Sequence, residues 1–202
     1  ECMNGGGLYL KDGSSRAIIR NVNRSRDQIV DEHIAVRGCF FNGNRFKQPG
    51  AHPEREPYGN NQVADGSFIT GFEFLGVNYL TIEDVTLWNV RSFGAIIGNA
   101  SRIAIRNATV DHGAPPDIDR EYLQTDGLHF KGPLQYVTID NVRFRTGDDA
   151  LAFNADDMRT DDLTIRNEFG PHVRHGPILD VTVSNMQLMD SLYGVRFLSS
   201  KQ

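Results

Sequence analysis

Short segments in which apolar and polar residues alternate recur along the chain. When seven of them are aligned, Val or Ile fills one column, and Asn, Asp or Gly fills another two residues later. These segments are RAIIRNV (16–22), HIAVRGC (33–39), YLTIEDV (79–85), RIAIRNA (102–108), YVTIDNV (136–142), DLTIRNE (162–168) and DVTVSNM (180–186). A period of two and a preference for Val, Ile and Thr are typical of β-strands, whereas helices repeat every three to four residues. The pattern predicts strands that recur about every 20 to 25 residues.

A second set of segments begins with a small residue and continues with the same alternation. Its members are GLYL (7–10), GAII (94–97), GLHF (127–130), ALAF (150–153) and GVRF (194–197). Further alternating segments follow the Asn column, so each repeat supplies three strands. Repeats of this kind predict an all-β fold, a parallel β-helix that forms one domain over residues 1–202. Asn tolerates left-handed backbone and can hydrogen-bond to the Asn of the next repeat, so this column is expected to be structural.

Two stretches depart from the repeat. Residues 42–66 and 111–125 contain Pro, Gly and charged residues without periodicity, and both are predicted to be loops. Long loops that leave a regular scaffold often wall a binding cleft. Surface loops without a function are the alternative.

Three aspartates lie at equivalent positions of two successive repeats. Gly127 and Ala150 occupy the same column, so Asp126 and Asp149 precede equivalent strands, and Asp148 lies one residue earlier. Adjacent strands are about 4.8 Å apart, so we expect the three carboxylates to gather on one outer face that is open to water. Like charges at that distance raise at least one pKa. Glycosidic-bond cleavage needs such a set: Asp148 would protonate the leaving oxygen, and Asp126 and Asp149 would activate a water.

This assignment has geometric requirements and alternatives. An inverting mechanism requires an acid-to-base gap of about 6.5 to 9.5 Å. Strict alternation along the strands would direct Asp126 and Asp149 inward, so the bend has to break that alternation. Asp beside Gly is also common in ordinary turns, and the same oxygens could bind calcium, as could those of NADDMRTDD (154–162).

Composition narrows the possible partners. A net charge of −5 offers no basic surface for phosphates, so nucleic acid is not an expected partner. No apolar run is long enough to span a membrane, and the first residues lack the pattern of a signal peptide. Cys2 and Cys39 could form a disulfide or remain thiols.

Over about residues 75–200, the chain resembles glycoside hydrolase family 28, the polygalacturonases and their relatives. The resemblance rests on QTDGLHF, TGDDALAF and YGVRFLSS, taken in this order after the repeat LTIEDVTLWNV. It implies a right-handed parallel β-helix of the pectin lyase-like superfamily, an exported protein (secreted or periplasmic), and inverting hydrolysis of pectic polysaccharides without a cofactor or metal. The Asn-Thr-Asp aspartate of the family corresponds to Asp126, and its Gly-Asp-Asp pair corresponds to Asp148 and Asp149, with Asp148 as general acid. The arginine of its Arg-Ile-Lys motif corresponds to Arg196.

The chain departs from the family at positions that contact uronate. Gln124 replaces the Asn of Asn-Thr-Asp, and Leu198 replaces the Lys that meets a substrate carboxylate. The Gly-His-Gly motif is absent, although FGPHVRHGP (169–177) offers His172 and His175 as candidate substrate-binding residues. The predicted substrate is therefore a pectin-like or related glycan, acidic or neutral. Further candidates for sugar contact are His129 and the aromatic side chains Tyr58, Trp88 and Tyr122, although Trp88 is expected to pack between repeats.

Two other classes of function remain open from the sequence. A polysaccharide lyase or uronate epimerase would use calcium and a basic residue, and a tailspike, adhesin or glycan-binding β-helix would use the repeats only as a rod. The chain begins near a strand and stops just after another, without a capping helix, and unpaired strand edges favour association. We therefore expect a fragment of a longer protein or an end-to-end assembly.

Overall fold

The computed structural model describes residues 6–14, 16–25, 27–48, 69–113, 125–156 and 176–199. Within these ranges the chain is all-β, with one short 3₁₀ helix, η2 (Arg45–Lys47), and no α-helix. The strands are β1 (Gly7–Tyr9), β2 (Ile19–Arg20), β3 (Asp31–Arg37), β4 (Phe40–Asn42), β5 (Phe72–Glu83), β6 (Thr86–Trp88), β7 (Ala95–Asp111), β8 (Leu128–Arg145), β9 (Asp149–Asp156), β10 (Ile178–Ser184), β11 (Gln187–Asp190) and β12 (Tyr193–Ser199).

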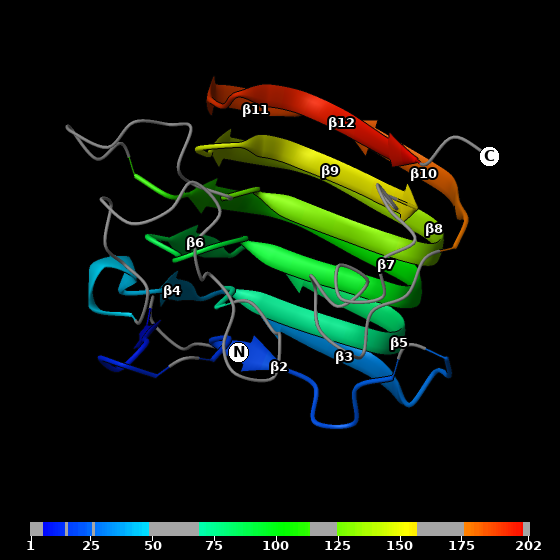
Figure 1. Ribbon diagram of the computed structural model, residues 1–202, viewed down its shortest axis with the longest axis horizontal. Helices are drawn as coiled ribbons and strands as arrows, with labels where there is room; N and C mark the ends of the chain where they lie inside the picture. Colours follow the sequence, from blue (N-terminus) through cyan, green and yellow to red (C-terminus); the bar gives the residue numbers. More distant parts are fainter. Residues whose placement is uncertain are drawn as a thin grey trace, which may run out of the picture.

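All pairings between these strands are parallel, and they fall into three stacks. The long strand β7 contributes to each stack in turn through residues 95–98, 100–106 and 108–111. The first stack contains β2, β5, β7, β8, β9 and β12; the second contains β3, β5, β7, β8 and β10; the third contains β1, β4, β6, β7, β8 and β11. Figure 1 shows successive passes of the chain lying one above another, from β2 and β3 at the bottom to β11 and β12 at the top.

Left-handed residues form the bends between the second and third stacks. Asp84, Asn107, Asn141 and Asn185 have φ angles of 54°, 51°, 51° and 52°. The Asn107 side chain donates to Asp84 Oδ1 over 3.0 Å, and that of Asn141 donates to Asn107 Oδ1 over 2.9 Å. These bonds confirm the structural role that the sequence predicts for this column.

Two of the aligned segments belong to other stacks than the sequence alignment predicts. Ile19 pairs with Phe72 in the first stack, so Asn21 is not part of the Asn column. Gly7–Tyr9 pairs with Phe40–Asn42 in the third stack, and not with the equivalents of Gly127. Short alternating segments are alike in sequence, and only the neighbouring strands decide which stack they join.

The core is built from rows of inward-facing side chains, one from each pass. In the first stack Phe130 stacks on Phe153 with ring centroids 5.1 Å apart, and Phe153 stacks on Phe197 at 5.5 Å. In the second stack Ile82, Ile105 and Ile139 follow one another and are buried. Because side chains of similar size lie on one another in each row, they fill the interior without voids.

Regular structure continues past the predicted start of each loop. Asn42 still belongs to β4, residues 45–47 form η2, and Asp111 ends β7. Of the predicted loop residues, 49–66 and 114–124 lie outside the described residues.

Cys39 is disulfide-bonded and therefore carries no free thiol. The chain has only two cysteines, and Cys2 lies outside the described residues. Of the two alternatives that the sequence left open, the structure supports the disulfide.

The Phe130 row offers a test of the core. Phe130→Ala removes a fully buried ring that contacts Phe153, and we expect a loss of about 3–5 kcal/mol in the free energy of unfolding. Leu192→Ala, at a side chain 52% exposed, is the control and should cost no more than about 0.5 kcal/mol. Urea unfolding of both variants measures the difference, and equal costs would contradict the assigned row.

Candidate active site: three aspartates at one bend

Asp126, Asp148 and Asp149 meet where the third stack leads into the first. Asp126 directly precedes Gly127 and β8, and Asp149 begins β9. The N–H of Gly127 donates to the carbonyl of Asp149 over 2.8 Å, so the two bends lie one on the other. One carboxylate oxygen from each of the three residues lies within 4.8 Å of those of the other two. The predicted clustering is therefore present.

The small residue after each bend is required by close backbone approach. A Cβ added at Gly127 would lie 2.5 Å from the carbonyl oxygen of Ala150 and 2.5 Å from Cδ1 of Phe144. No larger residue fits between the Ala150 backbone and the Phe144 ring. This contact fixes the bend that carries the acids.

The acids turn toward the outer side of the first stack. Asp126 contacts His129, whose Nδ1 lies 2.5 Å from Asp126 Oδ2, and Asp149 Oδ2 lies 3.6 Å from Nη1 of Arg196. His129 and Arg196 belong to one row, joined through Ala152, on the opposite side of the strands from the core residue Leu128. The bend therefore breaks strict alternation, as the functional assignment requires.

The expectation that all three carboxylates are open to water is wrong. Asp126 and Asp149 are buried, and only Asp148 and Arg196 are half-exposed. Asp126 Oδ1 accepts the N–H of Asp149 over 3.3 Å, whereas Asp149 Oδ1 has no hydrogen-bond partner among the described residues. The cluster is recessed, with Asp148 as its most accessible acid.

The spacing also differs from the predicted acid-to-base gap. Oxygens within 4.8 Å of one another are closer than the roughly 6.5 to 9.5 Å of inverting glycosidases, because adjacent strands hold the acids directly above one another. Two acceptors at this distance can share one water, since each hydrogen bond needs only about 2.8 Å. The geometry therefore fits a shared water at Asp126 and Asp149, but it does not support inversion by itself.

Burial raises the pKa of every acid in the cluster, and repulsion between carboxylates adds to it at Asp148 and Asp149. Desolvation raises the pKa of Asp126 to about 7, although the N–H of Asp149 and the cations Arg196 and Lys131 oppose it. Desolvation and then the charge of Asp126 raise the pKa of Asp148 to about 6. Desolvation, with repulsion from both other acids, raises the pKa of Asp149 to about 7. The three groups titrate as a coupled set that retains protons close to neutral pH.

His129 contacts Asp126, and a second residue orients its ring. The Asn154 amide nitrogen lies 3.5 Å from His129 Nε2, and the Phe93 ring packs against the imidazole with centroids 4.9 Å apart. If the amide donates to Nε2, Nδ1 carries the proton and donates to the Asp126 carboxylate. His129 therefore contacts an acid of the cluster, and its predicted contact with sugar hydroxyls stays a prediction.

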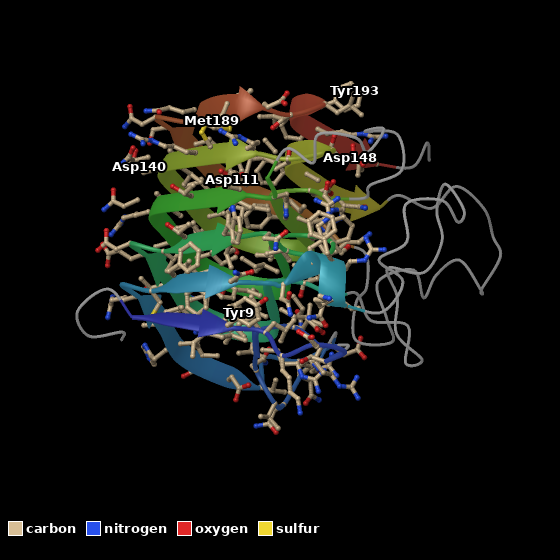
Figure 2. The ribbon with its side chains drawn as sticks, turned by 90° about the vertical axis from the view of Figure 1, so that its left-hand side faces the viewer. Tyr9, Asp111, Asp140, Asp148, Met189 and Tyr193 are labelled. Carbon is tan, nitrogen blue, oxygen red and sulfur yellow. The ribbon has the colours of Figure 1, made fainter. Side chains whose placement is uncertain are left out.

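The sequence reasoning missed Lys131, Asn154 and Tyr193. Lys131 and Asn154 share an outward row with Leu198, and both are buried. Tyr193 pairs in register with Asp149, and the Arg196 guanidinium lies 5.5 Å from the centre of its ring. Figure 2 shows Tyr193 close above Asp148. The signal was present in the strand alternation, which places residues 131 and 154 two positions after His129 and Ala152.

The remaining predicted residues are Trp88, which lies away from the cluster, and several that the structure does not describe. His172, His175, Gln124, Tyr58 and Tyr122 lie outside the described residues, as does most of the segment 154–162 that was considered for calcium. Trp88 lies in the third stack, where it packs against Phe40 with ring centroids 6.2 Å apart, so it does not face the acids.

No known protein family, curated protein or solved structure matches the chain. Within the described ranges, no helix is long and apolar enough to cross a membrane.

The raised pKa values predict how stability depends on pH. Folding raises the pKa of the cluster from 3.8 to about 6 or 7, so the folded state binds more protons than the unfolded state in this range. The contribution of these protons to stability is complete below about pH 4 and is lost as the pH rises toward 7. Urea unfolding at pH 4, 5.5 and 7 should show this loss, and Asp149→Asn should reduce it.

Asp140→Asn is the matched control for this measurement. Hydrogen bonds from Ser184 and Asn185 lower the pKa of Asp140, so its contribution has the opposite sign and disappears as the pH falls. The control should leave the loss between pH 4 and 7 in place. An equal effect of both substitutions would contradict the cluster as its source.

Proposed function

We propose that this chain is a right-handed parallel β-helix of the pectin lyase-like kind and that it hydrolyses glycosidic bonds of a polysaccharide or oligosaccharide. Three parallel stacks visited in turn support this fold, and right-handed crossovers are the rule for parallel strands. The resemblance of the site residues Asp126, Asp148, Asp149 and Arg196 to those of glycoside hydrolase family 28 supports the chemistry.

The observation that carries the proposal is the recessed set of three acids with raised pKa values. Hydrolysis requires a proton for the leaving oxygen and a carboxylate that activates water. Because the three acids titrate together near neutral pH, the set can hold a proton and a negative charge at the same time. Burying two carboxylates side by side is costly even with His129 and Arg196 beside them, and a catalytic role accounts for that cost.

Differences in accessibility support separate roles for the three acids. Asp148 is the half-exposed acid and reaches the leaving oxygen of a bound glycan, so it acts as general acid. Asp126 and Asp149 are close enough to share the attacking water. Arg196 pairs with Asp149 while remaining partly exposed, so it can also bind a substrate oxygen.

The substrate is a pectin-like or related glycan, acidic or neutral. Leu198 occupies the position where the family has its carboxylate-binding Lys, which weakens the case for galacturonan itself. Tyr193, half-exposed beside Asp149, offers an aromatic face on which a sugar ring can stack. Because polysaccharides of this kind lie outside the cell, we propose that the protein is exported.

Hydrolysis can be tested on a panel of plant and algal glycans. We expect new reducing ends without the ultraviolet absorbance of an unsaturated product, and the same result after chelation with EDTA. Asp148→Asn should lower kcat at least about 100-fold, and Asp140→Asn should not. An unsaturated product or a requirement for calcium would indicate a lyase, and binding without turnover would indicate a glycan-binding protein.

A leaving group that needs no proton tests the separate roles of the acids. On a nitrophenyl glycoside of the cleaved sugar, Asp148→Asn should recover most of its activity, because the nitrophenolate departs without a proton. Asp149→Asn should remain inactive on it, because water activation is still needed. The reverse result would exchange the two roles, and the anomer formed first, read by NMR, decides between inversion and retention.

His129 is expected to set the protonation of Asp126. Its Nδ1–H stabilises the ionised carboxyl, so His129→Phe, which removes the donor, should raise the pKa of Asp126 further. The acid limb of the kcat/KM profile should then move to higher pH, and kcat should fall. His129→Asn retains a donor and should recover part of both changes. An unchanged profile in His129→Phe would contradict this role.

A further inference from the structure

Two arginines are buried close to the bend that carries the acids. Arg45 is 2% exposed and Arg91 is 5% exposed. Arg45 begins η2, which follows β4 (Figure 1), and its Nη1 donates to the carbonyl of His112 over 3.2 Å. The His112 ring in turn lies against the bend, with Nε2 3.0 Å from the carbonyl oxygen of Asp126. The proposed hydrolysis uses neither arginine.

Hydrogen bonds hold the backbone around Arg45 in place. The N–H of Arg45 donates to the carbonyl of Asn89 over 3.0 Å. Asn44 and Gln48, on either side of η2, are both buried, and the Asn44 side chain donates to the carbonyl of Leu10 over 3.0 Å. These contacts anchor both ends of η2, so the Arg45 guanidinium is held in the interior.

The Arg45 guanidinium carries a charge that no described carboxylate balances. Its Nη2 is buried without a hydrogen-bond partner, and no ion pair joins Arg45 to an acidic residue in the described part of the chain. Its contacts with the His112 carbonyl and with the Phe46 ring, whose centre lies 5.6 Å away, supply no full negative charge. Burial and then the charge of Arg91 lower the pKa of Arg45 to about 10, so it remains protonated at neutral pH. Buried charges are costly unless they are paired.

Arg91 and His112, the ionisable side chains beside Arg45, supply no negative charge. Burial lowers the pKa of Arg91 to about 10, so this side chain is also a cation at neutral pH. Burial lowers the pKa of His112 to about 4, so its ring is neutral. The electrostatic potential at Arg45 Nη2 is therefore positive, and the N–H groups of this atom are available to an anion.

We propose that Arg45 binds a small monovalent anion, such as chloride or formate, through Nη2, and that the charge of Arg91 strengthens this binding. Burial sets the size of the ligand, because a nearly inaccessible guanidinium can enclose a small ion but cannot receive a sugar acid. Since His112 joins Arg45 to the backbone of Asp126, the bound anion stabilises the fold next to the acids. The proposal is independent of hydrolysis.

The dependence of stability on the anion tests the site. Thermal unfolding of the whole chain is followed by circular dichroism at constant ionic strength, while gluconate, which is too large to be enclosed, is replaced stepwise by chloride. A ligand that binds only the folded state raises stability with the logarithm of its concentration. For the wild type, we expect the unfolding midpoint to rise by about 3–6 °C for each tenfold increase in chloride above the Kd. Formate should have the same effect.

Arg45→Met removes the charge and leaves an apolar side chain in its place. In gluconate we expect this variant to be at least as stable as the wild type, because a buried charge without a partner is gone. In chloride it should gain no stability. Arg37→Met is the matched control, since the Arg37 side chain is 53% exposed and pairs with Glu83, and it should keep the full chloride effect. An equal chloride effect in Arg45→Met, or none in the wild type, would overturn the proposal.

Bromide in place of chloride locates the anion directly and needs no variant to fold. Crystals of the wild type grown in bromide should show an anomalous-scattering peak in contact with Arg45 Nη2, and crystals of Arg45→Met should lack it. If the wild type shows no peak at Arg45, the stabilising anion binds elsewhere and the assigned site is wrong. A peak that persists in Arg45→Met would likewise exclude Arg45 as its ligand.

Discussion

Parallel backbone pairing between successive passes of the chain is the constraint on which the rest of this structure depends. Each pass lies in register on the one before it, so a residue is held above its equivalent from an earlier repeat. Rows of like side chains follow directly, including the Phe row of the core and the left-handed Asn column at the bends. The geometry of every other feature derives from this spacing of about 4.8 Å.

The same spacing that stabilises the core makes the acidic cluster costly. Apolar residues gain contacts when they stack, but the stacking of Asp149 on Asp126 places two buried carboxyls within a few ångströms of each other. The bend is tightly packed, because a Cβ added at Gly127 would collide with the backbone of Ala150 and the ring of Phe144. Burial of all three acids, with repulsion added at Asp148 and Asp149, therefore appears as raised pKa values. A rigid scaffold can in this way maintain proton-binding acids near neutral pH, which is the property that hydrolysis requires.

Each row of equivalent side chains continues from one pass of the chain to the next, and this continuity brings the residues of the candidate site together. The row of His129, Ala152 and Arg196 brings a ring and a cation to the acids from different passes, with only a small side chain between them. Within the part of the chain that the structure describes, the inward rows continue into the outermost strands, where apolar side chains such as Phe197 are exposed. One repetitive interaction thus brings residues of different passes together at the candidate site.

Alternation and recurrence in the sequence determined the all-β parallel character, the Asn column and the meeting of Asp126, Asp148 and Asp149, because these follow from period and register alone. The sequence misassigned Ile19, Asn21 and residues 7–10, since short alternating segments carry no information about which stack they join. Burial of the acids, the contact of His129 with Asp126 and the close spacing of the carboxylates were decided only by the tertiary structure. They depend on where the bend turns and on which side chains from other passes reach it, and a linear pattern does not encode these distances.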